Sequence, residues 1–136
     1  MCRVKRTALE RCVDFAIGML TFAGAHAIEV AMWRVWFGGE HDPWFLNAGS
    51  AAGFTLGCVF IASGVASMRG GSARPGRGVT LALGAFAAMA VVLFLKEGGP
   101  GTIFPIVLAV GGLFLLISST LGAWIGREVR GAVKGR

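Results

Sequence analysis

The chain has 136 residues, of which 55% are hydrophobic and only 15% are charged. Soluble domains carry about 25% charged residues, and a soluble chain of this length has too small an interior to cover so much apolar surface. The composition therefore excludes an ordinary soluble domain and predicts a protein that lies largely in lipid. The formal net charge of +6 does not indicate nucleic acid as a partner, because the basic residues lie between and beside apolar runs.

Four long apolar runs follow one another, at residues 13–37, 45–68, 79–95 and 103–126. A helix that crosses a bilayer needs about 20 residues, with a range of about 17 to 25. The runs lack the alternation of apolar and polar residues that is typical of a membrane β-barrel. We therefore expect an all-α membrane protein, a single domain over residues 1–136. Because the connections are short, the four transmembrane helices should form an antiparallel bundle.

The basic residues flank these runs unevenly. Arg34 and Lys96 fall on one side of the expected bundle, and the other eleven fall on the opposite side: Arg3, Lys5, Arg6, Arg11, Arg69, Arg74, Arg77, Arg127, Arg130, Lys134 and Arg136. Cytoplasmic loops carry the excess of lysine and arginine in membrane proteins. We expect both termini in the cytoplasm, a location in a bacterial inner membrane, and contact of the basic flanks with anionic lipid headgroups.

Ionisable residues within the first run are the main functional signal. In the stretch AGAHAIEVAMWRVW, residues 23–36, His26 and Glu29 are three residues apart and share one helix face. Arg34 lies near the outer boundary, where its side chain can reach the headgroups. A charge at the bilayer centre costs about 2.5–3.5 kcal/mol, so such residues often mark proton or ion pathways. We predict that Glu29 and His26 form a proton- or cation-binding pair; a structural clasp between helices is the alternative.

Aromatic residues gather at the ends of the expected helices. Trp33, Trp36 and Trp44 lie near the outer interface, together with Arg34, and Trp124 lies near the inner one. Tryptophan side chains are enriched at both membrane surfaces. We predict that these five residues are interface anchors.

Small residues recur on one face of two of the runs. In the second run the face comprises Gly49, Gly53, Gly57 and Gly64, which fall within roughly 80° of one another at 100° per residue. In the fourth it comprises Gly111, Ser118, Gly122 and Gly126. Small residues let membrane helices approach closely. We predict that both faces pack against helices, either within the chain or of another copy or partner.

The stretch Ala23–Trp33 resembles the first helix of the small multidrug resistance transporters over about ten residues. In that family one glutamate in the first helix binds drug or protons, and two copies form the transporter, so the resemblance implies this role for Glu29. The chain departs from the pattern because it contains no tyrosine, has no tryptophan in the third run, and carries His26 beside the acid. We therefore assign no family.

Other chemistry is sparse in the sequence. There is no nucleophile–base set, phosphate-binding glycine loop or paired-cysteine motif, so we expect no enzyme, cofactor or metal centre. The last three runs contain no charged residue, and a relay across the membrane would need water, hydroxyl groups or a second copy of the first helix. The leading hypothesis is an oligomeric transport or channel-like protein. The alternatives are an accessory or assembly subunit of a larger membrane complex and a holin-like pore former.

Overall fold

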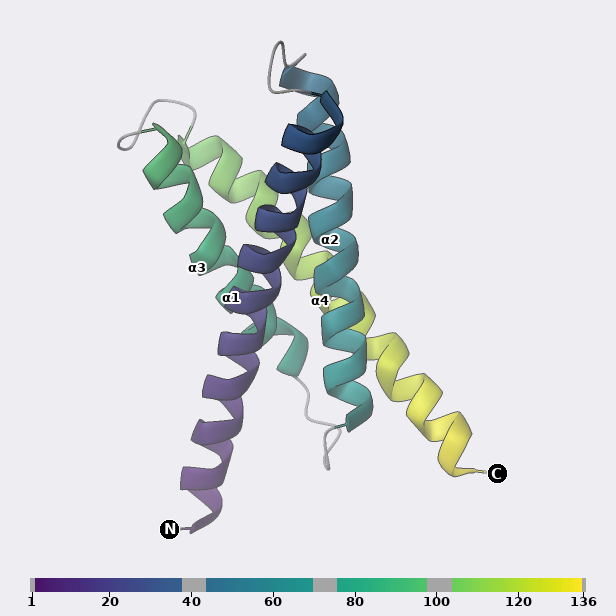
Figure 1. Cartoon of the computed structure of the whole chain (residues 1–136). Helices are drawn as coiled ribbons and strands as arrows, with labels where there is room; N and C mark the ends of the chain where they lie inside the picture. Colours follow the sequence, from purple (N-terminus) through teal and green to yellow (C-terminus); the bar gives the residue numbers. More distant parts are fainter. Residues whose placement is uncertain (1, 38–43, 70–75, 98–103, 136) are drawn as a thin grey trace.

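The computed structural model describes residues 2–37, 44–69, 76–97 and 104–135 of the chain. These residues form four α-helices: α1 (Cys2–Phe37), α2 (Trp44–Arg69), α3 (Arg77–Glu97) and α4 (Phe104–Lys134). The predicted all-α architecture with four helices is confirmed. Both termini lie at the same end of the molecule (Figure 1).

Three of the helices contain segments that are long and apolar enough to cross a membrane, namely Thr7–Met32, Arg77–Leu95 and Pro105–Lys134. In α2 the described apolar segment, Gly53–Arg69, is shorter, and α2 itself begins nine residues earlier, at Trp44. The composition thus supports a membrane protein, with three helices of full spanning length.

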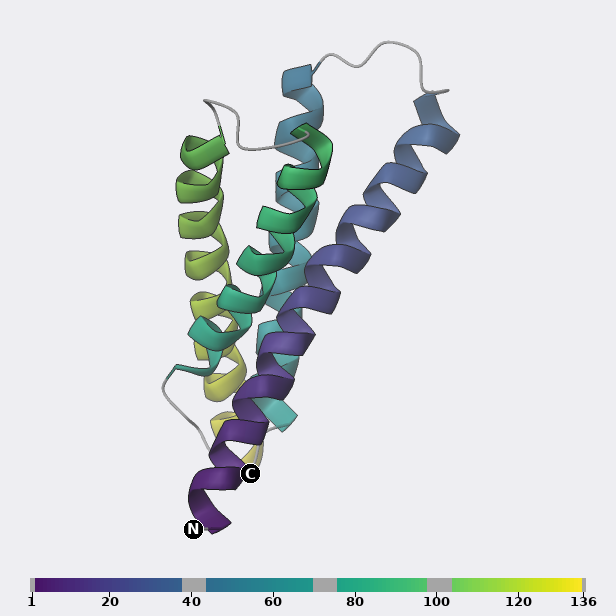
Figure 2. The same cartoon turned by 90° about the vertical axis from the view of Figure 1, so that its left-hand side faces the viewer.

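Two helices continue well beyond their apolar runs. α1 has 36 residues and α4 has 31, which correspond to lengths of about 54 and 46 Å. Nothing breaks α1 between Cys2 and Asp14, because this stretch contains neither glycine nor proline and is rich in the good helix formers lysine, arginine, alanine and leucine. The basic N-terminal residues are therefore helical, and α1 is inclined across the other helices (Figure 2).

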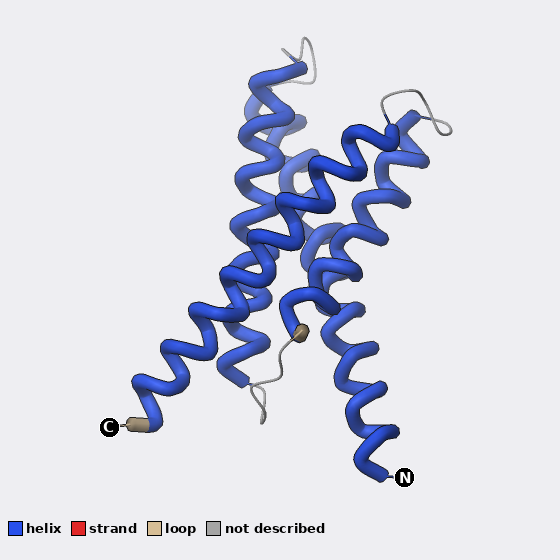
Figure 3. The backbone as a smooth tube through the Cα atoms, turned by 180° about the vertical axis from the view of Figure 1, so that it is seen from behind, coloured by secondary structure: helices blue, strands red, loops and turns tan. Residues whose placement is uncertain are grey.

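The helices pack as two pairs. α1 packs mainly on α3, and α2 packs mainly on α4. Contacts between α3 and α4 join the two pairs, whereas α2 and α3 scarcely touch. Seen from behind, α4 runs diagonally across the bundle (Figure 3).

The contact between α1 and α3 depends on two glycines. A methyl group on Gly18 would overlap the carbonyl oxygen of Leu81, and one on Gly84 would overlap the carbonyl oxygen of Phe15. The two backbones therefore approach closely, as small residues permit in membrane helices.

At the beginning of α3, Gly76 has a φ of 96°, a left-handed conformation that glycine adopts without steric cost. Its carbonyl oxygen accepts the first helical bond from Thr80 N at 3.0 Å.

The apolar core lies where the two pairs meet. Its largest fully buried side chains are Leu81, Leu115 and Val59, one each from α3, α4 and α2. Two adjacent serines of α4 bond its neighbours: Ser118 Oγ donates to the carbonyl oxygen of Leu56 at 2.8 Å, and Ser119 Oγ donates to that of Gly78 at 2.7 Å. These bonds satisfy the hydroxyl groups and fix α4 against both α2 and α3.

Candidate functional site

The His26–Glu29 pair lies on one face of α1. His26 Nδ1 is 3.8 Å from Glu29 Oε2, and the two side chains are 24% and 13% exposed. Residues 14, 18, 22 and 25 form the buried stripe of α1, and Glu29 follows at the next helical turn. The pair therefore extends the packed face of the helix toward its C-terminal end.

Phe22 lies one helical turn before His26 and packs against its imidazole ring. The rings of Phe22 and His26 are stacked, with their centroids 6.4 Å apart and an interplanar angle of 17°. Phe22 itself belongs to the buried core. The orientation of the imidazole is thus coupled to the packing of α1, while Nδ1 faces the carboxylate one turn further along.

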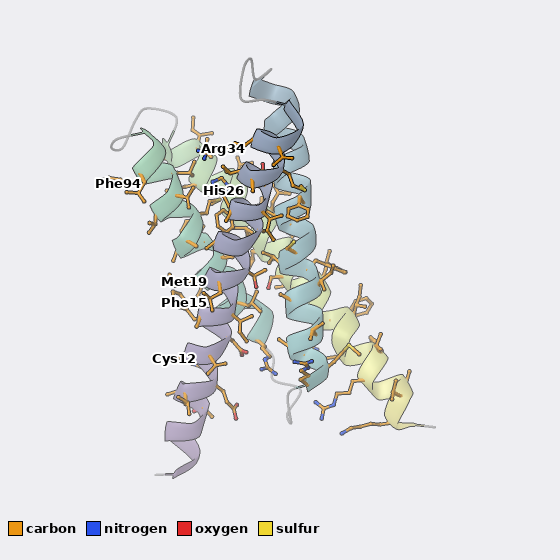
Figure 4. All side chains as sticks on the ribbon, viewed as in Figure 1. Cys12, Phe15, Met19, His26, Arg34 and Phe94 are labelled. Carbon is orange, nitrogen blue, oxygen red and sulfur yellow. The ribbon has the colours of Figure 1, made fainter. Side chains whose placement is uncertain are left out.

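The depth of the pair follows from the beginning of the first apolar run. Counted from Val13, His26 lies about 20 Å and Glu29 about 24 Å along the helix axis, within a hydrocarbon core of about 30 Å. Arg34 is exposed in the last turn beyond. Figure 4 shows this order along α1, with Cys12, Phe15 and Met19 in the lower half and His26 and Arg34 in the upper half. The pair is closer to the Arg34 end than to the N-terminal end.

Chemically, an imidazole and a carboxylate in contact can exchange a proton near neutral pH or share a cation. Within the described ranges, no group of three or more His, Cys, Asp or Glu side chains could hold a metal ion. A cation at this pair would need further oxygen ligands beyond these two side chains.

The predicted interface anchors are only partly described. Trp124 is exposed on α4, as an anchor at a membrane surface requires. Trp33, Trp36 and Trp44 lie within helices, but their side-chain positions are outside the described residues.

The predicted small-residue face of α4 packs within the chain. Methyl groups on Gly122 and Gly126 would overlap the carbonyl oxygens of Phe60 and Gly64 on α2. A methyl group on Gly111 would come within 2.8 Å of Met89 Sδ on α3.

The corresponding face of α2 divides into two parts. Gly64 packs on α4, with the carbonyl oxygen of Gly122 3.4 Å from where its Cβ would lie. Around Gly53 and Gly57 there is open space in the described part of the chain, because no atom of another described helix lies within 4 Å of such a Cβ. The surroundings of Gly49 lie outside the described residues.

One ion pair was missed by the sequence analysis. Arg77 Nε donates to Asp14 Oδ1 at 2.9 Å, and Arg77 Nη2 is also 2.9 Å from that oxygen. The Asp14 side chain is only 7% exposed. The two residues are 63 positions apart. The sequence contains several basic residues and gives no signal for which of them would pair with Asp14.

Comparison with known proteins found no family model, curated protein or solved structure that matches this chain.

Proposed function

We propose that the protein is a small transport or channel-like membrane protein that acts as an oligomer. In this proposal Glu29 and His26 bind and release a proton or a cation. The carrying observation is their side-chain contact on the packed face of α1, within the first apolar run. A carboxylate that is largely buried in such a segment is costly to ionise, and such groups in membrane helices commonly serve ion or proton transfer.

We also propose an orientation. The four helices form an antiparallel bundle with both termini in the cytoplasm of a bacterial cell and the pair near the outer surface of the inner membrane. The uneven distribution of lysine and arginine supports this orientation, because eleven of the 13 lie on the N- and C-terminal side of the runs. Protons or cations would then reach Glu29 from outside along the short path past Arg34.

An oligomer would supply the further ionisable groups that a proton or cation path across the membrane needs. The apolar runs after the first contain no charged residue, so a second copy of α1 is the natural source of further ionisable groups. The open face around Gly53 and Gly57 on α2 supports this arrangement, because small residues permit close approach of another helix.

The first test removes the charge of Glu29 with little change in shape. We expect Glu29→Gln in reconstituted vesicles to lower proton or alkali-cation flux at least tenfold, measured with a pH-sensitive or cation-sensitive dye trapped inside. Glu128→Gln is the matched control, because Glu128 is exposed near the end of α4. Equal flux through both variants and the wild-type protein would overturn the proposal.

An accessory subunit of a larger membrane complex is the second candidate. The open small-residue face at Gly53 and Gly57 favours it equally, since a helix of a different protein would fit there as well as a copy. Purification in a mild detergent distinguishes the two. A homo-oligomer with no other component favours transport, whereas a second protein in fixed stoichiometry favours the subunit.

A further inference from the structure

A groove of about 570 Å³ opens at the end of the bundle where α2 ends and α3 begins. Most of its lining comes from α2, from Cys58 to Arg69, and Ile17 of α1 also lines it. Arg77 of α3 lies at the same end as Arg69. The groove therefore joins three helices and does not include the His26–Glu29 pair.

The groove combines two chemical environments along its length. Between its ends the lining is apolar and includes Ala62 and Val65. Among the described residues that line the groove, the charged ones are Arg69 and Arg77, and both stand at one end. A groove that is apolar along its length and cationic at one end suits an amphipathic anion better than a polar solute or an apolar molecule.

The length of the groove corresponds to one leaflet. Cys58 and Arg69 are eleven residues apart, which is about 16 Å along a helix. Half of a hydrocarbon core of about 30 Å is about 15 Å. With Arg69 at the headgroup level, Cys58 lies near the middle of the bilayer, so the apolar part of the groove covers the depth of one set of acyl chains.

The two arginines retain hydrogen-bonding capacity for an anion. Arg77 uses Nε and Nη2 on Asp14 Oδ1, so three of its five N–H donors are left. Arg69 is exposed and has no ion pair or hydrogen bond within the described part of the chain. Among the described residues at this end of the groove, Arg69, Arg77 and Asp14 together carry one net positive charge. Guanidinium groups bind phosphate in a bidentate manner.

We propose that the groove is a binding site for an anionic phospholipid. One acyl chain lies along α2 between Ile17 and Ala62, and the phosphate meets the guanidinium groups of Arg69 and Arg77. A second copy is a poorer occupant, because a twofold contact would bring the same arginines of both copies together. The site depends on the protein lying in a membrane but not on any activity of His26 and Glu29.

The test measures lipid retained by the detergent-purified full chain. Native mass spectrometry with added phosphatidylglycerol and phosphatidylcholine of equal chain length should show preferential phosphatidylglycerol adducts. We expect Arg69→Gln to lower this preference about fivefold, the factor that one arginine near an anionic lipid contributes. Arg127→Gln is the matched control, because it removes the same charge from a residue that does not line the groove, and it should leave the preference unchanged.

A second variant tests the apolar part of the site. Ala62→Phe places an aromatic ring in the apolar part of the groove and should reduce the adducts of both lipids. Circular dichroism checks that the variant keeps its helicity. Equal retention of the two lipids by the wild-type protein would overturn the proposal, as would equal effects of Arg69→Gln and Arg127→Gln. The proposal would also be wrong if Ala62→Phe dissociated an oligomer and left the lipid adducts unchanged, since another copy would then fill the groove.

Discussion

Asp14 lies at the beginning of the first apolar run, where sequence alone places it near the membrane surface. The structure instead buries it against Arg77, the first residue of α3. This contact fixes the N-terminal part of α1 to α3 on the same stripe that carries Glu29. We therefore expect the loss of either partner to destabilise the fold, because a buried charge without its counterion is strongly destabilising.

We expect Asp14→Asn and Arg77→Gln each to lower the free energy of unfolding by about 1–3 kcal/mol. This is below the 3–5 kcal/mol typical of fully buried pairs, because the Arg77 side chain is 21% exposed. The double variant should lose less than the sum of the two. Reversible unfolding in mixed detergent, followed by circular dichroism, gives the coupling energy. Strict additivity would show that the pair contributes no coupling.

At the scale of single residues, the sequence predicted the neighbours along one helix but not those across helices. His26 and Glu29 are three positions apart, and helical geometry alone brings them together. The Asp14–Arg77 contact depends on how α1 and α3 cross, which no local pattern encodes. Phe22 shows both cases. Its stacking on His26 follows from its position one turn earlier, whereas its burial depends on the other helices.

At the scale of helices, the existence and order of the four elements could be predicted because apolar runs of this length have few alternatives in lipid. Their ends could not, because hydropathy reports where lipid ends and not where the helix ends. α1 begins at Cys2, well before its apolar run. Small residues on α2 and α4 indicated packing surfaces, but not that Gly53 and Gly57 would be open while Gly64 is covered.

Gly18 and Gly24 provide a matched test of the contact between α1 and α3. Both lie in α1, but a methyl group on Gly18 meets the backbone of α3, and one on Gly24 meets no atom of another described helix within 4 Å. We expect Gly18→Ala to destabilise the protein by about 1–3 kcal/mol through overpacking. Gly24→Ala should be neutral or stabilising by up to about 1 kcal/mol, because alanine is the better helix former.

Thermal unfolding of the two variants in the same detergent measures the difference directly. Gly84→Ala should behave like Gly18→Ala, because its methyl group would meet the backbone of α1 at Phe15. If Gly18→Ala were as stable as Gly24→Ala, the close approach of α1 and α3 would not be present in the folded protein.

For the whole molecule, the two ends of the bundle differ in the residues that they carry. One end has the His26–Glu29 pair and Arg34, and the other has the groove with Arg69 and Arg77. If α1 spans the membrane, these features lie toward opposite surfaces. The orientation therefore decides which compartment supplies protons or cations to Glu29 and which leaflet supplies lipid to the groove.

Accessibility of single cysteines tests that orientation. Val35 is exposed near the end of α1, and Gly135 is exposed just after α4. In a background with the three native cysteines replaced by serine, we expect a membrane-impermeant maleimide to label Val35→Cys in intact bacterial cells. Gly135→Cys should react only after the membrane is opened, because the basic C-terminal flank is expected to stay in the cytoplasm.

Equal labelling of both cysteines in opened cells is the control for reactivity. Labelling of Gly135→Cys but not Val35→Cys in intact cells would reverse the orientation, and with it the side from which Glu29 is reached.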